Sequence, residues 1–182
     1  NLLPDFQYFA DHFFDDPSYL KIDGHPVVFI YLTRVYFRDY PGYGALAELR
    51  AAFPDLYLIA DDVFGQNYRS THASEWDAVT AYDAYGQTLG SYGSTRAALD
   101  HLALILSQAK MAANSRSVGL IPFATPGFND RAIRDGHRGA PRYFVDEPTS
   151  VEGDLFRAML RDVVVPKVDP LAANMLMVTS FN

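Results

Sequence analysis

The sequence contains no cysteine, and this absence excludes disulfide bonds, thiolate zinc sites and a cysteine nucleophile. It also lacks an apolar run near the ~20 residues that a transmembrane helix needs, so no membrane span is expected. No Gly-x-Ser-x-Gly segment occurs, which disfavours a serine triad. The histidines show neither His-x-His nor His-Glu-x-x-His spacing, and none lies at the end of an expected strand. We therefore expect no metal site, and we expect no cofactor.

Positive charge is scarce: 15 Lys and Arg face 22 Asp and Glu, which gives a net charge of -7. An acidic chain repels phosphate backbones, so we expect no nucleic acid partner. Aromatic residues are plentiful, with 13 Phe and 12 Tyr. They fit either a ligand pocket lined by rings or an aromatic core. The chain begins at Asn1 without a methionine. This is compatible with a removed leader peptide and favours a secreted or periplasmic location.

Short apolar runs alternate with segments of helical periodicity along the chain. The apolar runs predict strands at 26–32, 56–60, 76–82, 118–124 and 175–181. Apolar residues at helical spacing predict helices at 2–14, 43–53, 95–114 and 155–164. The pair Asp23-Gly24 indicates a tight turn before the first strand, and a long polar loop is expected over 125–148.

This alternation predicts parallel βαβ units, and hence an α/β fold. Two architectures remain open, a doubly wound sheet without a Gly-rich phosphate loop and an incomplete (β/α)8 TIM barrel. A complete barrel takes about 250 residues, whereas this chain has 182, opens on a helix and closes on a bare strand. We therefore expect one partial barrel domain over 1–182. It would hold about the last five strands, with the first three strands and the final helix outside the sequence.

Polar and aromatic residues stand at the carboxyl ends of the expected strands. In a parallel barrel these ends meet at one mouth. Tyrosine rings can cover the apolar faces of a sugar while carboxylates and amides bind its hydroxyl groups. We therefore expect a carbohydrate ligand, with Tyr82 as the inward member of the Tyr82–Asp83 pair. The candidate substrate-binding residues are Tyr31, Asp61, Tyr82, Asp83, Asn129, Asp130, Arg131 and Asn182.

Each of these residues also has a structural interpretation. Asp61 and Asp62 also fit the start of a turn or the cap of a short helix. Tyr31 and Tyr82 could be core rings whose hydroxyls reach the surface. The arginines of the long loop (Arg131, Arg134, Arg138 and Arg142) fit either a solvated loop or internal ion pairs with the nearby Asp130.

Four segments resemble glycoside hydrolase family 99 and its WbsX-like relatives, in the family's order. Residues 16–31, Asp-Pro-Ser-Tyr-Leu-Lys-Ile-Asp-Gly-His-Pro-Val-Val-Phe-Ile-Tyr, are similar to the stretch through the family's fourth barrel strand. Residues 76–82, Trp-Asp-Ala-Val-Thr-Ala-Tyr, are similar to its sixth strand. Residues 121–131, Ile-Pro-Phe-Ala-Thr-Pro-Gly-Phe-Asn-Asp-Arg, with Arg134 after them, resemble the seventh strand and its loop. Residues 177–182, Met-Val-Thr-Ser-Phe-Asn, resemble the eighth strand.

The resemblance implies a (β/α)8 barrel that cleaves α-mannosidic bonds internally and without a metal. The family's acidic pair follows the eighth strand in a motif Asn-Glu-Trp-x-Glu, whose Asn is matched by Asn182. Neither glutamate is in this sequence, so no catalytic residue is assigned and this chain is expected to be inactive. Tyr82 loosely matches a substrate-contacting tyrosine of the family. The expected function is that of a fragment of such a hydrolase. The alternative is a non-hydrolytic carbohydrate-binding or polysaccharide-biosynthesis protein on the same barrel.

Overall fold

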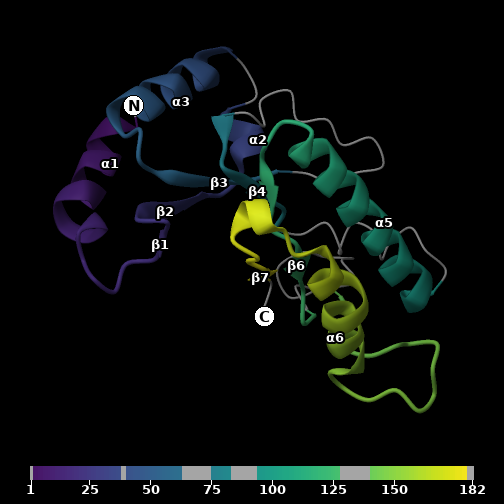
Figure 1. The fold of residues 1–182 in the computed structure, drawn as a ribbon. Coiled ribbons are helices and arrows are strands. Elements are labelled where there is room, and N and C mark those ends of the chain that lie inside the picture. Colours follow the sequence, from purple (N-terminus) through teal and green to yellow (C-terminus); the bar gives the residue numbers. More distant parts are fainter. Residues whose placement is uncertain (1, 38–39, 63–74, 83–93, 128–139, 180–182) are drawn as a thin grey trace, which may run out of the picture.

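The protein has a mixed α/β fold in which a curled parallel sheet is covered by helices (Figure 1). The structure is a computed structural model of the 182-residue chain. It describes residues 2–37, 40–62, 75–82, 94–127 and 140–179. None of the helices within these ranges is long and apolar enough to cross a membrane.

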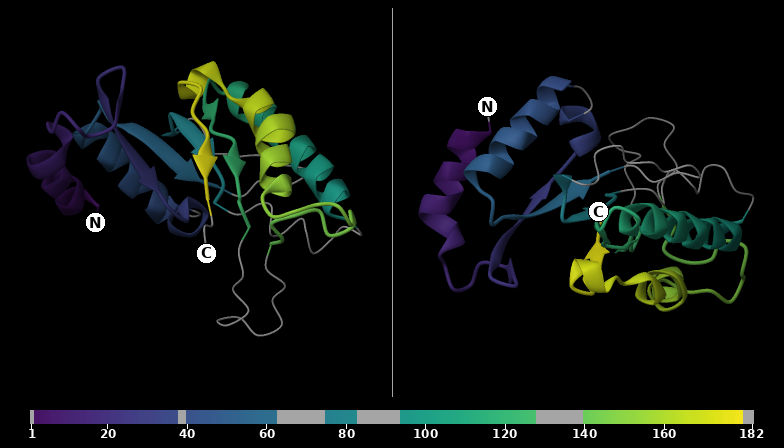
Figure 2. Two further views of the ribbon diagram at one scale, coloured as in Figure 1. Left: turned by 90° about the horizontal axis from the view of Figure 1, so that it is seen from below. Right: turned by 45° about the horizontal axis from the view of Figure 1, so that its top comes forward.

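The main sheet contains five strands in the order β1-β2-β3-β4-β5. They are β1 (Lys21–Ile22), β2 (His25–Ile30), β3 (Tyr57–Asp61), β4 (Ala78–Thr80) and β5 (Gly119–Leu120). Strands β2 to β5 run parallel to one another in chain order. Two further strands, β6 (Phe123–Ala124) and β7 (Met177–Val178), form a second parallel pair. Figure 2 shows this pair beside the end of the main sheet, so that the strands together trace a half-barrel.

Alternation along the strands divides the core into two faces, because successive side chains of a strand point to opposite sides of a sheet. One cluster, on the inner face of the curl, holds Val27, Ile59, Ala78, Ile121 and Ala172. The other cluster, on the outer face, includes the intervening strand residues Leu58, Ala60, Val79 and Leu120. Strands that are apolar on both faces are typical of a parallel sheet covered on both sides.

The helices bury their apolar stripes against the outer face. Four α-helices contribute buried residues to the outer cluster: α1 (Leu3–Phe9), α3 (Tyr40–Ala52), α5 (Thr95–Asn114) and α6 (Asp154–Ala158). Helix α1 continues in π-helical geometry as η1 (Ala10–Phe14), and α6 does so as η3 (Met159–Val164). A short helix, α2 (Thr33–Tyr36), follows β2 directly. Helices on the outer face of a curled parallel sheet fit the expected partial barrel better than a doubly wound sheet.

Apart from the positions of strand ends, the strands differ from the prediction in two places. The hairpin strand β1, which pairs antiparallel with β2 around Asp23-Gly24, was not predicted because only two of its residues pair. The strand predicted at 118–124 is divided into β5 and β6. Pro122 lies between them and has no N–H to donate to a ladder. Strand β5 pairs with β4, and β6 pairs with β7. This segment therefore connects the main sheet to the second strand pair.

The inner face is covered at the amino end of the strands. Ala172, in the 3₁₀ turn η5 (Pro170–Ala172), packs into the inner cluster, and the Tyr57 hydroxyl donates to the Leu171 carbonyl at 3.3 Å. Gly119 lies so close to this turn that a Cβ there would come within 2.7 Å of Ala172 Cβ and of the Leu171 carbonyl carbon. The absence of a side chain at Gly119 therefore lets the turn lie directly against β5.

Candidate functional site

Two tyrosines meet at the carboxyl ends of neighbouring strands. Tyr31 follows β2 and Tyr82 lies two residues beyond β4, and their ring centroids are 5.2 Å apart in an edge-to-face arrangement. Both rings remain accessible, since Tyr31 is 47% exposed and Tyr82 is 39% exposed. By alternation from Val27 and Ala78, both tyrosines follow the inner face of the sheet. An exposed aromatic pair therefore lies at this end of the inner face.

Asp61, at the end of the strand between them, ties the two tyrosine-bearing segments together. One carboxylate oxygen accepts the Leu32 N–H at 2.9 Å, and the other accepts the Tyr82 N–H at 2.8 Å. The Thr33 hydroxyl donates to the Asp61 carbonyl at 2.5 Å. Asp61 is fully buried, and a carboxylate that accepts backbone N–H groups is stabilised in that setting. Asp61 thereby fixes where both tyrosines leave their strands.

The backbone at Leu32 adopts a left-handed conformation, with φ 55° and ψ 38°. Such a turn is unfavourable for a leucine, so the surrounding contacts must hold it. The bond from the Leu32 N–H to Asp61 is one of these contacts, and the start of α2 directly after Leu32 is another. This turn ends β2 two residues before the strand end predicted from the apolar pattern at 26–32.

Thr80 is a further polar residue on the inner face, and it was not among the predicted site residues. It is the last residue of β4, pairs with Asp61 in the parallel register, and is fully buried. It precedes Tyr82 by two residues and therefore shares its face. Thr80 is a polar residue at a position where alternation from Ala78 leads one to expect an apolar side chain. This was the sequence feature that could have identified it.

The structure brings together three of the predicted site residues, Tyr31, Asp61 and Tyr82. The others, Asp83, Asn129, Asp130, Arg131 and Asn182, lie outside the described residues. At the ends of β6 and β7, the hydroxyls of Thr125 and Thr179 are 3.1 Å apart and both residues are buried. That pair of hydroxyls links the last two strands to each other.

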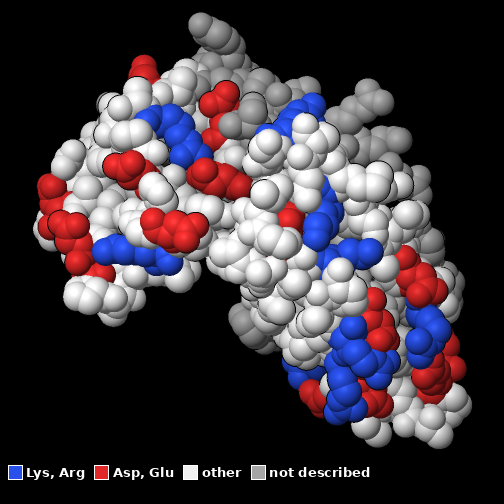
Figure 3. Space-filling view, viewed as in Figure 1, with Lys and Arg blue, Asp and Glu red and all other residues white. Residues whose placement is uncertain are grey.

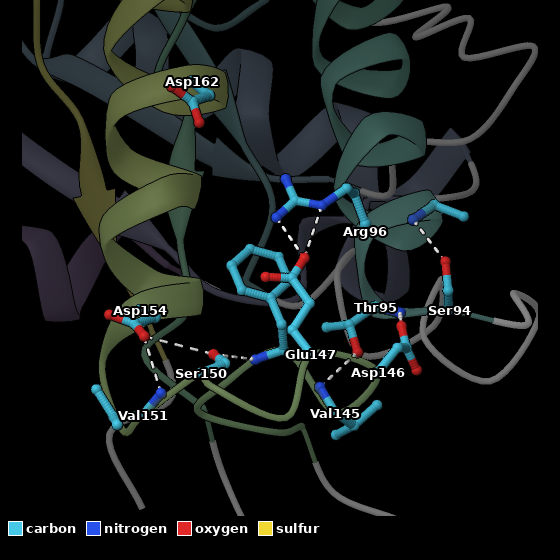
Figure 4. A network of polar contacts seen from close by, with 12 residues as sticks. Ser94, Thr95, Arg96, Val145, Asp146, Glu147, Ser150, Val151, Asp154 and Asp162 are labelled. Carbon is cyan, nitrogen blue, oxygen red and sulfur yellow. Dashed lines mark hydrogen bonds and ion pairs between the residues drawn. The ribbon is translucent and has the colours of Figure 1, made fainter.

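A polar network attaches residues 140–154 to the start of α5 (Figure 4). Asp146 accepts the Thr95 N–H at 2.9 Å, and the Thr95 hydroxyl accepts the Val145 N–H at 3.3 Å. Arg96 pairs with Glu147 at 2.6 Å and lies 4.3 Å from the centroid of the Phe144 ring. Ser94, which directly precedes α5, accepts the Ala97 N–H and caps the helix. The network therefore holds the chain that follows β4 and the chain that follows β6 against each other.

Charges on the α6 side of the molecule occur as mixed pairs (Figure 3). Arg142 pairs with Glu152 at 2.9 Å, Arg157 with Asp154 at 3.0 Å, and Arg161 with Asp162 at 2.5 Å. The ion-paired interpretation thus holds for Arg142, whereas Arg131, Arg134 and Arg138 lie outside the described residues. Within the described ranges, no group of three or more acidic or histidine side chains is arranged to hold a metal ion.

Comparisons with known proteins gave a single kind of likeness. No protein-family model and no curated protein sequence matches the chain. A solved structure, the GH99 endo-alpha-mannosidase from Bacteroides thetaiotaomicron, matches with a TM-score of 0.62 at 19% sequence identity. The likeness concerns the fold. It covers 100% of this chain and 49% of that enzyme, so the chain spans about half the length of its structural neighbour. The chain therefore has a glycoside hydrolase-like α/β architecture, consistent with part of a TIM barrel.

Proposed function

We propose that this chain forms the carbohydrate-binding side of a glycoside hydrolase-type barrel that acts on α-linked mannose glycans. The observation that carries the proposal is the exposed Tyr31–Tyr82 pair, held by Asp61 at the carboxyl ends of adjacent parallel strands. In barrels of this architecture the ligand binds at that end of the strands. The structural neighbour, an endo-alpha-mannosidase, supports the choice of glycan.

The chemistry of the pair suits a sugar. Each tyrosine offers a ring face for the C–H groups of a pyranose and a hydroxyl for its oxygens. The rings meet edge to face at 74°, so a ligand can contact one face while the other ring flanks it. Because Asp61 is buried and accepts two backbone amides, we assign it to positioning the tyrosines rather than to contacting the sugar.

Hydrolysis requires a second element of the proposal. Glycosidases use two carboxyl groups on either side of the scissile bond, one of which donates a proton to the leaving oxygen. Asp61 is a poor candidate for either role, since its two oxygens already accept N–H groups of Leu32 and Tyr82. On the resemblance to family 99, we place the acidic pair directly after the position of Asn182. The same commitment of Asp61 favours, as a second candidate, a protein on this barrel that binds the glycan without cleaving it.

Binding measurements on two tyrosine variants test the proposal. Isothermal titration of the full-length protein with α-mannan oligosaccharides should give saturable binding, and β-glucan oligosaccharides of equal length serve as the ligand control. Tyr31→Ala and Tyr82→Ala should each weaken binding by about threefold to tenfold, the value of a lost aromatic contact. Tyr36→Ala is the matched control, because Tyr36 is a tyrosine on α2 that is 63% exposed and is not a member of the pair. Unaltered binding by both site variants would reject the aromatic platform.

A further inference from the structure

Thr80 differs from the other buried threonines. Thr33 donates to the Asp61 carbonyl, Thr95 accepts the Val145 N–H, and Thr125 and Thr179 bond to each other. Thr80 is as buried as these residues, yet its hydroxyl oxygen has no hydrogen-bond partner in the part of the chain that the structure describes.

An unbonded buried hydroxyl destabilises the folded state, because the group loses its bonds to water and gains none. Valine has nearly the same shape and favours strands as strongly as threonine does. The hydroxyl at position 80 therefore brings no gain to the ligand-free fold. A polar group of this kind calls for a functional explanation, and its position supplies one.

The position borders the proposed sugar site. Thr80 pairs with Asp61 in the parallel register and shares the inner face with Tyr82. Asp61 bonds the Tyr82 N–H, so Thr80 lies on the stretch of β4 that leads into the tyrosine pair. Tyr31 and Tyr82, whose rings are partly exposed, lie at the carboxyl end of the same face, so a ligand that contacts the pair lies at the end of the face that carries Thr80.

We propose that the Thr80 hydroxyl binds a hydroxyl group of the carbohydrate that contacts Tyr31 and Tyr82. A sugar hydroxyl can donate or accept, and so can a threonine hydroxyl, so the bond forms in either direction. The side chain is buried in the ligand-free chain, so a neighbouring group has to move before the sugar can reach the hydroxyl. This assignment rests on the proposed carbohydrate site and makes Thr80 a specificity-determining residue within it, because an analogue lacking the bonded hydroxyl leaves Thr80 unpaired.

Two substitutions at Thr80 separate its hydroxyl from its shape, measured in the full-length protein with α-mannan oligosaccharides as the probe. Thr80→Val keeps the shape and removes the hydroxyl. It should weaken binding by about threefold to tenfold, the value of one hydroxyl hydrogen bond, while the melting temperature stays equal or rises. Thr80→Ser keeps the hydroxyl and should retain most of the affinity. Thr125→Val is the matched control: it leaves the buried Thr179 hydroxyl unpaired, so it should lower the melting temperature and leave binding unchanged.

The outcomes distinguish this inference from the function on which it rests. If the wild type and Thr80→Val bind the oligosaccharide equally, the role of Thr80 is wrong and the proposed function stands. If Thr80→Val melts well below the wild type, the hydroxyl has a structural partner and the inference is wrong as well. If the wild type does not bind the oligosaccharide, the proposed function and the inference both fail.

Discussion

At the scale of single residues, the buried Asp61 carboxylate fixes the strand ends at the mouth of the half-barrel. It bonds the backbone of Leu32 on one side and of Tyr82 on the other, so one side chain sets two strand ends. The sequence analysis placed Asp61 at this edge from the apolar strand before it. The backbone groups that its carboxylate binds were not predictable, because they depend on the left-handed turn at Leu32.

Asp61→Asn should lower the free energy of unfolding by about 1–3 kcal/mol, because an amide NH₂ would replace one of two acceptors and leave a buried N–H unpaired. Urea unfolding followed by circular dichroism measures the loss. Glu48→Gln, which removes a charge from an exposed position of α3, should stay within about 0.5 kcal/mol of the wild type. Equal stability of the two variants would show that Asp61 does not hold the strand ends.

Tyr57, near the opposite end of the same strand, should make stability depend on alkaline pH. Burial, together with the negative charges of Asp77, Asp169 and Asp23, raises the pKa of Tyr57 to about 12. Between pH 10 and about 12 the unfolded chain therefore releases this proton while the folded chain keeps it, so stability falls as pH rises through that window.

Tyr57→Phe should remove this loss. The difference in urea midpoint between wild type and Tyr57→Phe should be constant below pH 10. As pH rises toward 12, the midpoint of the wild type should fall relative to that of the variant. The variant also loses the hydrogen bond to the Leu171 carbonyl. This loss changes the difference in midpoint by the same amount at every pH, so it does not alter how the difference varies with pH. A difference that stays constant over the whole range would contradict the raised pKa.

At the scale of elements, helix and strand types followed from periodicity, whereas their ends did not. Helix α5 occupies the predicted residues 95–114, since Ser94 caps it and its apolar stripe is continuous. The strand predicted at 76–82 is shortened to Ala78–Thr80. Such boundaries depend on partners far away in the chain, as with the bond of Asp61 to Tyr82 or the pairing of β6 with β7. A single sequence contains no signal for these partners.

Neighbouring acids in the network at the start of α5 should differ in their effects on stability. Asp146→Ala removes an acceptor from the first turn of the helix and should cost about 0.5–2 kcal/mol. Glu147→Ala removes an ion pair with Arg96 whose side chains are 42% and 55% exposed, and should cost about 1 kcal/mol or less. Thermal unfolding in low salt and in 1 M NaCl separates the two, because only the second effect should largely disappear in salt. A larger loss in Glu147→Ala would reverse this ranking.

At the scale of the whole molecule, strand–helix alternation was enough to predict the order of the parallel strands and the covered outer face. The curvature of the sheet, and the change of pairing partner from β4 to β7 at Pro122, depend on strand register. Alternation alone does not specify this register. The same limit applies to the site. The places of Tyr31 and Tyr82 at strand ends could be predicted, whereas the proposal for Thr80 needed its pairing with Asp61 and a comparison with the other buried threonines.

The 182-residue chain, expressed alone, should show no measurable hydrolysis of an aryl α-mannoside or of α-mannan oligosaccharides. We place the acidic pair beyond Asn182, and loss of general acid or base help alone lowers rates by about 10²–10⁴-fold. Reducing-end release followed by chromatography measures the rate, with a protein that extends past Asn182 as the positive control. Robust turnover by the 182-residue chain would place the acids within it and would overturn our assignment.

The turn η5 makes the two ends of the half-barrel different. Because Ala172 packs into the inner cluster and the Leu171 carbonyl accepts the Tyr57 hydroxyl, η5 covers the amino end of the inner face beside β3 and β5. Under the proposed function, a glycan that reaches the inner face past the tyrosines would meet packed side chains at this end. Such a dead-end geometry suits an encounter with one internal stretch of a polymer laid across the opening.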